Sequence, residues 1–218
     1  MDDTKMNRVT EILKRLKRLY PEPIVELDYT TPFELMVASL MAAQNRDTVI
    51  NRMTPAVFRK YRGPAEYVAV DPSELEQDII KSGFFRQKTK AIRALSQKLL
   101  DDYGGKVPET MDELLTLPGI GRKTANVILS FAMGKAEGIV VDTHHLRVNA
   151  RLGLSSQKLA DKMEKEMVEI VPEKDWIIWS SSITLHGRRV CVAKKPKCSE
   201  CVLGPDLCPS YKNLPNFA

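Results

Sequence analysis

Apolar residues recur at intervals of three and four along most of the chain, which is the spacing of one face of an α-helix. The first such stretch ends at the segment Pro21–Pro23, and its apolar face comprises Val9, Ile12, Leu13, Leu16 and Leu19. No stretch gives a convincing alternation of apolar and polar residues as a half-buried strand would. The pattern therefore predicts an all-α fold.

Capping residues mark where the predicted helices begin and end. Thr31 to Glu34 form a capping box with a proline at the first helical position, opening a helix that ends near Ala43. Gly104 closes a longer helix over residues 86–103, and Asp142 caps another after an apolar run. Further helices are expected to begin at residues 47 and 71 and to cover residues 108–116, 122–133, 156–171 and 174–185.

Length and composition indicate a globular protein. The 218 residues suffice for one domain or two small ones, and 43% of them are hydrophobic, which is enough to form a core. The longest uncharged apolar stretch, residues 35–43, is far shorter than the roughly 18–20 residues of a membrane span. The N-terminal segment is amphipathic and lacks the apolar core of a secretory signal. We therefore expect a soluble, intracellular protein without a membrane partner.

The basic residues are concentrated in two runs that contain no acidic residue. The chain has 33 Lys and Arg against 28 Asp and Glu, a net charge of +5. Six basic residues lie between Lys81 and Lys98, and five lie between His186 and Lys197. A single run of this kind is often a solvated helix face. Two such runs favour a polyanionic partner, of which nucleic acid is the first candidate.

All four cysteines fall within 18 residues, at Cys191, Cys198, Cys201 and Cys208. Their spacing, C-x6-C-x2-C-x6-C, indicates four thiolates around one metal centre. Zinc sites usually contain two C-x2-C pairs, whereas iron–sulfur clusters accept wider and unequal intervals. The spacing therefore favours an iron–sulfur cluster, with a zinc site and, less favoured, disulfides as the alternatives.

The heptapeptide LPGIGRK, residues 117–123, predicts a hairpin between two helices. Gly119 and Gly121 permit a tight turn whose backbone amides point outward at a helix start, where they can bind a phosphate. Ile120 between them would anchor the hairpin in the core. The alternative is an ordinary connection between helices with glycine caps.

Lys123 lies in the first turn of the helix that follows the hairpin. The helix dipole disfavours an ammonium group at this end, and an amine nucleophile must be uncharged. The alternative is a charged, phosphate-binding lysine. Asp142 is a possible partner, because a capping carboxylate can still present one oxygen to a cleft. His144 and His145 are interpreted as residues that line the site or belong to the core, and not as metal ligands.

Three linked motifs carry a resemblance to a known family: LPGIGRKTANV, the downstream VDTH, and the four-cysteine loop after LHGR. Over residues 8–212 the chain resembles endonuclease III, of the helix-hairpin-helix DNA glycosylase superfamily. The resemblance implies two lobes. A six-helix barrel lobe with the hairpin would comprise residues 25–135, and a lobe with a [4Fe-4S] cluster would comprise residues 1–24 and 136–218.

The resemblance also implies roles for individual residues. Lys123 matches the lysine that forms a Schiff base, and Asp142 matches the catalytic aspartate. Gln44 matches a glutamine that enters the space left by an extruded nucleotide, and Phe84 stands where a wedge residue is often leucine. DNA phosphates would be bound by the hairpin Gly119, Ile120 and Gly121 and by the loop residues Lys194, Lys195 and Lys197. The cluster ligands would be Cys191, Cys198, Cys201 and Cys208.

The function implied is that of a bifunctional DNA glycosylase and abasic-site lyase of base excision repair. Its substrate would be duplex DNA with oxidised pyrimidines or abasic sites, and we expect a monomer in the cytoplasm of a prokaryotic cell, associated with the nucleoid. One alternative is a mismatch-specific or other helix-hairpin-helix glycosylase. Another is a DNA-binding iron–sulfur protein without catalytic activity, against which the pair Lys123 and Asp142 argues.

Overall fold

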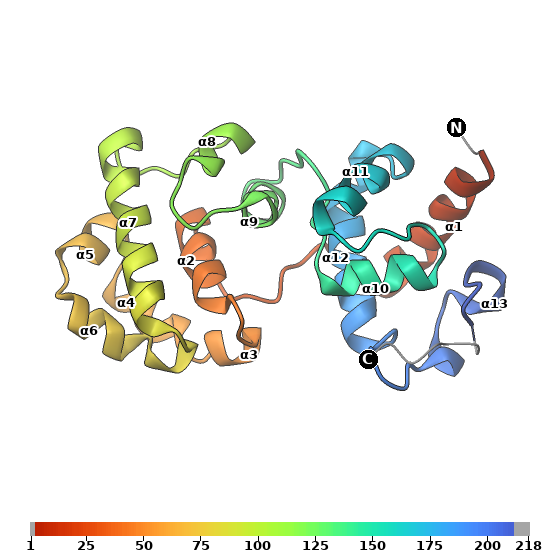
Figure 1. The fold of residues 1–218 in the computed structure, drawn as a ribbon, viewed down its shortest axis with the longest axis horizontal. Coiled ribbons are helices and arrows are strands. Elements are labelled where there is room, and N and C mark those ends of the chain that lie inside the picture. Colours follow the sequence, from red (N-terminus) through yellow and green to blue (C-terminus); the bar gives the residue numbers. More distant parts are fainter. Residues whose placement is uncertain (1–2, 212–218) are drawn as a thin grey trace. The chain divides into compact units, whose positions relative to one another are not determined.

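The computed structural model describes residues 3–211, and every regular element among them is helical, with no strand (Figure 1). The prediction of an all-α fold is confirmed. The chain divides into two compact units. We call Val25–Lys135 the hairpin unit, and the described residues up to Ile24 and from Ala136 onward the cysteine unit. No helix among the described residues is long and apolar enough to cross a membrane.

The hairpin unit surrounds helix α2, whose residues are mostly buried. A long helix α7 packs against it, and shorter elements complete the unit. In chain order these are α2 (Pro32–Ala42), α3 (Asp47–Ile50), α4 (Thr54–Lys60), α5 (Pro64–Ala69), α6 (Pro72–Asp78), the 3₁₀-helix η1 (Ile80–Ser82), α7 (Phe85–Tyr103), α8 (Met111–Leu115), α9 (Arg122–Val127) and the π-helix η2 (Ile128–Ala132).

Side-chain caps predicted from the sequence mark the start of two helices in this unit. The Thr31 side chain accepts a hydrogen bond from the Glu34 amide at 3.2 Å, as the capping box predicts. Asp71 accepts one from the Ser73 amide at 2.8 Å in the same way. The helix expected over residues 122–133 differs from the prediction, because it changes from α to π geometry after Val127. Such π segments are frequent at functional sites.

The cysteine unit has a separate hydrophobic core around the fully buried Trp179. The N-terminal helix contributes its apolar face to this core, and Lys17 pairs with Asp175 at 2.5 Å. The elements are α1 (Asp3–Leu19), α10 (Thr143–Arg151), α11 (Ala160–Ile170), the 3₁₀-helix η3 (Glu173–Asp175), α12 (Trp176–Arg189), the 3₁₀-helix η4 (Cys198–Glu200) and α13 (Gly204–Leu207).

Helix α12 ends one turn later than its predicted end at Leu185. The helix continues through Gly187, which lies against His144 on α10. A Cβ atom at position 187 would come within 2.7 Å of the His144 Cβ. The glycine therefore serves close packing between α10 and α12, and does not end the helix.

Candidate functional site

The hairpin between α8 and α9 has the conformation that its sequence predicts. The side chains of Leu117 and Ile120 are buried in the core of the hairpin unit and so anchor the turn to that core. Gly119 has a φ of 80°, and a Cβ atom there would lie 3.0 Å from Leu40 Cδ2. The left-handed backbone angle therefore favours glycine at this position, and the nearby Leu40 side chain adds to that preference.

At position 121, neither the backbone angle nor the available space demands a glycine. Its φ of −97° suits any residue, and a Cβ atom would meet no protein atom within 4 Å. It is the N-cap of α9 and gives that helix no side-chain hydrogen bond. The first-turn amides of a helix have no intrahelical acceptor. Open space in front of such amides allows an anion to approach the backbone closely.

Lys123 is the second residue of α9, and its side chain is exposed to solvent. The prediction that Lys123 lies in the first turn of the helix after the hairpin is therefore confirmed. An exposed primary amine at the start of a helix can attack an electrophilic carbon of a ligand whose phosphate is bound at that helix start.

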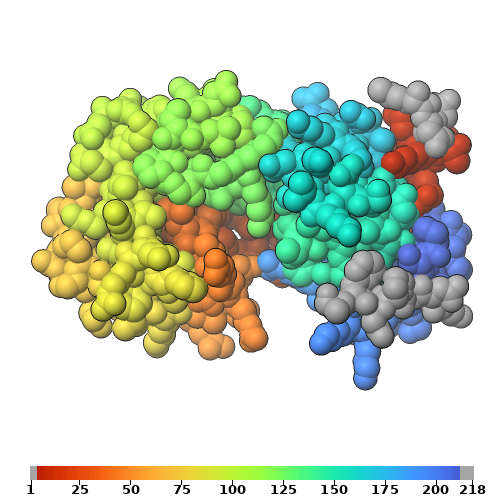
Figure 2. Space-filling view, in the orientation of Figure 1, coloured from red at the N-terminus to blue at the C-terminus, as the bar shows by residue number. Residues whose placement is uncertain are grey.

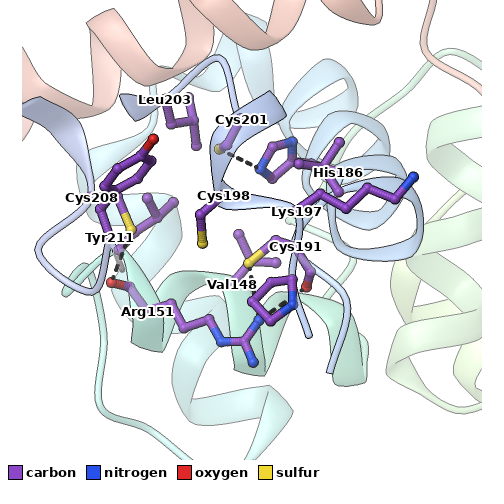
Figure 3. Close-up of a pocket in the computed structure, with 13 residues that line it drawn as sticks. Val148, Arg151, His186, Cys191, Lys197, Cys198, Cys201, Leu203, Cys208 and Tyr211 are labelled. Carbon is purple, nitrogen blue, oxygen red and sulfur yellow. Dashed lines mark hydrogen bonds between the residues drawn. The ribbon is translucent and has the colours of Figure 1, made fainter. Parts of the chain in front are cut away.

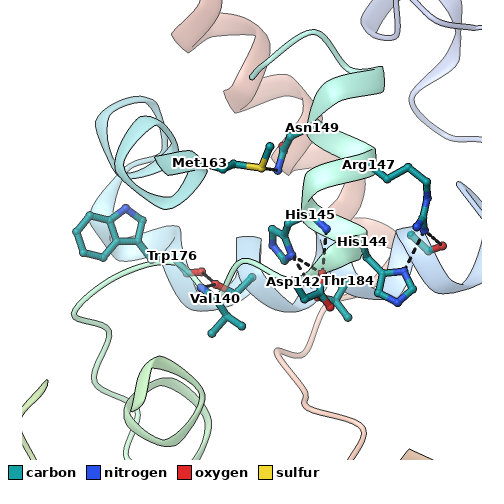
Figure 4. Close-up of polar contacts among 11 residues, drawn as sticks. Val140, Asp142, His144, His145, Arg147, Asn149, Met163, Trp176 and Thr184 are labelled. Atoms are coloured by element: carbon teal, nitrogen blue, oxygen red, sulfur yellow. Dashed lines mark hydrogen bonds and ion pairs between the residues drawn. The ribbon is translucent and has the colours of Figure 1, made fainter. Parts of the chain in front are cut away.

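Asp142 lies in the cysteine unit and is the N-cap of α10, as predicted (Figure 4). Its Oδ1 accepts a hydrogen bond from the His145 amide at 2.9 Å, and His145 Nδ1 lies 3.1 Å from the same oxygen. The Thr184 hydroxyl donates to Oδ2 at 3.3 Å. The side chain is 13% exposed.

Burial alone would raise the pKa of Asp142, but the hydrogen bonds and charge of His145 outweigh it and hold the pKa well below its usual range. The group is therefore a carboxylate throughout the neutral range. Such a group stabilises nearby positive charge and is a weak proton acceptor. The Nδ1 of neighbouring His144 lies 3.0 Å from Arg147 Nη2, and burial lowers the pKa of His144.

The four cysteine thiols line one cavity in the cysteine unit, together with apolar side chains such as Val148 and Leu203 (Figure 3). All four are free and half-buried. Among the described residues, no group of three His, Cys, Asp or Glu side chains is arranged to hold a single metal ion. Four thiols around a shared cavity suit a larger, polynuclear centre whose ligands stand further apart. Burial raises the pKa of the Cys201 and Cys208 thiols, which a bound metal would have to deprotonate.

Two buried basic side chains contact these sulfur atoms. Arg151 Nη1 lies 3.3 Å from Cys191 Sγ, and His186 Nε2 lies 3.5 Å from Cys201 Sγ. Burial lowers the pKa of His186 to about 4, so it is a neutral imidazole at neutral pH. Neither residue was identified from the sequence, because each becomes a neighbour of the cysteines only through folding.

Arg151 also holds the loop between the first two cysteines. Its guanidinium donates to the carbonyl oxygens of Val192 at 2.8 Å and Ala193 at 2.9 Å. The three lysines of this loop, Lys194, Lys195 and Lys197, are all exposed. Lys197 lies 4.0 Å from Glu200, so its charge is partly compensated. The exposed lysines therefore stand on a loop whose backbone is held in place by Arg151.

Gln44 and Phe84 lie on two loops of the hairpin unit and share an unusual backbone conformation. Their φ angles are 57° and 48°, in the left-handed region that non-glycine residues rarely adopt. Both side chains are exposed, and 62% of Phe84 is accessible to solvent. An exposed aromatic side chain on a strained backbone is a candidate contact for a ligand.

Only part of the basic run between Lys81 and Lys98 is available to a polyanion. Lys88 is buried, and Arg93 donates to the carbonyl oxygens of Tyr67 and Val70. Lys98 pairs with Asp102 at 2.5 Å. Fewer side chains of this run are therefore available to a polyanion than its six charges suggest, because counting charges along the sequence does not show which side chains are buried or already paired.

Comparison with known proteins gives consistent matches. Residues 37–173 match the family model of the HhH-GPD superfamily base excision DNA repair proteins. Endonuclease III of Synechocystis sp. is 44% identical over 207 residues, which are 95% of this chain and 94% of the relative. Two solved structures, a non-covalent endonuclease III–DNA complex and a trapped endonuclease III–DNA covalent intermediate, each match with a TM-score of 0.88 and 39% identity. Each match covers 95% of this chain and 97% of the other.

Proposed function

Since the chain belongs to the endonuclease III family of the HhH-GPD superfamily of base excision DNA repair proteins, we propose that it removes oxidised pyrimidines from duplex DNA. It is a bifunctional DNA glycosylase and abasic-site lyase. The observation that carries the proposal is an exposed amine, Lys123, in the first turn of the helix that follows the hairpin directly. Its site of action would be the chromosomal DNA of the cell.

The amine of Lys123 is proposed to attack C1′ of the damaged nucleotide. A bond forms between Nζ and C1′, the glycosidic bond breaks, and the base leaves with the electron pair and a proton. Opening of the sugar gives an iminium ion, which acidifies the protons on C2′. Loss of one of these protons expels the 3′ phosphate by β-elimination, and water then releases the lysine.

Asp142 is proposed to stabilise the positive charge that develops on the sugar. Its low pKa supports this role, because the group stays ionised where the enzyme works. The His145 amide and the Thr184 hydroxyl fix the orientation of the carboxylate. Because a carboxylate of low pKa is a poor base, we assign Asp142 mainly to electrostatic stabilisation and not to proton abstraction.

Several exposed groups are proposed to bind and distort the DNA. The hairpin Gly119, Ile120 and Gly121 at the start of α9 would hold a phosphate, and the loop lysines Lys194, Lys195 and Lys197 would hold others. A damaged base inside a duplex must be extruded before its sugar can be attacked, at a cost of a few kcal/mol. Gln44 would fill the gap and Phe84 would wedge the stack open, since both are exposed.

We further propose a [4Fe-4S] cluster with Cys191, Cys198, Cys201 and Cys208 as its ligands. Four free thiols around one cavity match the ligand set of such a cluster. The bound cluster would cross-link the C-terminal segment and so stabilise the loop between Cys191 and Cys198, which carries the lysines. Arg151 and His186 would donate hydrogen bonds to two of its ligand sulfurs.

The cluster proposal predicts a yellow-brown protein with about four iron atoms per chain. Metal analysis of the purified protein, with a visible absorption spectrum, tests this directly. Removal of the iron should loosen the cysteine loop and weaken DNA binding, because the loop that carries the lysines would no longer be held in one conformation. One zinc atom per chain without iron would contradict the proposal.

The catalytic proposal is tested with a panel of duplexes that each carry one defined lesion. Base release and strand cleavage are measured separately. We expect release of oxidised pyrimidines, with cleavage of the strand 3′ to the same site at a comparable rate. Base release without strand cleavage would indicate a monofunctional glycosylase. Preference for a normal base in a mismatch would contradict the proposed substrate class.

A further inference from the structure

Lys88 is the lysine of the first basic run that folds inward. It lies on helix α7 and is only 6% exposed. Its ammonium donates to the backbone carbonyl oxygens of Met41 and Ser82, both at 2.7 Å. Burial lowers the pKa of this group. A buried ammonium is costly for folding, so its position calls for a specific reason.

The two carbonyl groups lie at the ends of the segments that carry Gln44 and Phe84. Met41 belongs to the last turn of α2, where carbonyl oxygens lack an intrahelical donor, and Gln44 follows that helix. Ser82 is the last residue of η1, two positions before Phe84. The backbone amide of Lys88 also donates to the Phe84 carbonyl oxygen at 3.1 Å. One residue therefore holds both loops.

A second side chain joins the same two loops. Asn45, next to Gln44, donates through Nδ2 to the Ser82 carbonyl oxygen at 2.8 Å and to that of Lys81 at 3.2 Å. The Ser82 oxygen thus accepts from Lys88 and Asn45 together. Left-handed conformations at non-glycine residues persist only where the surroundings hold them. Lys88 and Asn45 provide these constraints for Gln44 and Phe84.

We propose that Lys88 is a positioning residue for base extrusion, which joins the Gln44 and Phe84 loops so that both side chains enter the duplex as one rigid unit. The inference rests on the proposed function, because it assigns a role to residues that act on duplex DNA. A lysine suits this role because its three donors, on an unbranched stem, can reach carbonyl groups of two separate loops. Direct phosphate binding does not account for Lys88, since its ammonium is buried against protein carbonyls.

The test is Lys88→Met, which keeps the length of the stem and removes the charge. Single-turnover base release is measured from a duplex with 5-hydroxycytosine opposite guanine, and strand cleavage is measured at a preformed abasic site. Lys88→Met should slow base release by about 10- to 100-fold, because small misplacement of positioning groups has effects of this size. Cleavage of the abasic duplex, which has no damaged base to extrude, should fall far less.

Leu99→Ala is the matched control, because it removes a fully buried side chain from the same helix α7. It lowers the stability of the hairpin unit without touching either loop. At a temperature where circular dichroism shows both variants to be folded, Leu99→Ala should leave the ratio of the two rates unchanged. Should Lys88→Met fail to fold, Asn45→Ala removes the second connection and should change the ratio in the same direction.

A double-mutant cycle with Phe84→Ala separates positioning from general destabilisation. If Lys88 acts through the wedge loop, Lys88→Met should cost much less in the Phe84→Ala background than in the wild type. Additive losses, or an unchanged ratio of rates in Lys88→Met, would overturn the inference. A wild-type protein that releases no base would instead refute the proposed function, so the two failures are distinguishable.

Discussion

Lys123→Gln should still bind a duplex with an abasic site, yet neither cleave it nor form a covalent adduct. The amide of glutamine cannot become the iminium that the reaction requires, whereas it retains much of the length and polarity of the lysine. Borohydride reduces an iminium to a stable amine, so the wild type should be trapped on DNA during the reaction. We expect the rate of strand cleavage to fall to the background of the assay, while the dissociation constant changes modestly.

Arg122→Gln is the matched control, because it removes a positive charge from the adjacent position of the same helix α9. This variant should bind somewhat more weakly, with a salt dependence lowered by about one phosphate contact, but should still form the borohydride-stable adduct. If Lys123 only bound phosphate, the two substitutions would have similar effects on affinity and neither would abolish turnover. A trapped adduct with Lys123→Gln would assign the nucleophile to another amine.

Asp142→Asn should fold normally and react about 100- to 1,000-fold more slowly, the usual cost of removing one group that stabilises transition-state charge. Asparagine is as good an N-cap as aspartate, so α10 keeps its start. The variant keeps the nucleophile and the capping oxygen, loses the negative charge and exchanges the other acceptor oxygen for an amide nitrogen. Single-turnover base release is the measurement, and an effect of less than threefold would contradict the electrostatic role.

The pH dependence gives a second readout for Asp142. Because its pKa in the folded protein lies below the unfolded value, the ionised group contributes stability above the ordinary pKa of an aspartate and loses it as the pH falls towards the folded pKa. The Asn variant should therefore unfold more readily than wild type at neutral pH, and this difference should shrink in strong acid. For the same reason, Asp142 should not produce an acidic limb of the rate profile near neutral pH.

The helical pattern was predictable because it rests on local rules. Periodic apolar residues, the Thr31 and Asp71 caps and the hairpin glycine Gly119 each depend on neighbours in the chain. The all-α fold follows from them without knowledge of tertiary contacts. The motifs around Lys123 and Asp142 were equally local, since each residue lies in the first turn or at the cap of its own helix.

What the sequence missed depends on contacts between distant segments. Lys88 looked like one member of a surface charge run, and its inward direction is set by carbonyl groups of Met41 and Ser82. Arg151 is separated by 40 residues from the cysteine that it contacts. The helix predicted to end at residue 185 continues to Arg189, and Gly187 within it allows close packing of His144. Each error concerns a polar or small residue whose role is defined by its tertiary neighbours.

The left-handed backbone at Phe84 limits which residues can replace it over evolutionary time. At a φ of 48°, a β-branched side chain clashes with its own backbone, whereas an unbranched Cβ is tolerated at modest cost. Valine and isoleucine are thus disfavoured at this position although they are as apolar as leucine. Exchange among leucine, methionine and phenylalanine remains open, so the wedge can vary in bulk while the loop keeps its shape. The backbone geometry at position 84, as well as selection for a particular lesion, therefore limits which amino acids can occupy this position.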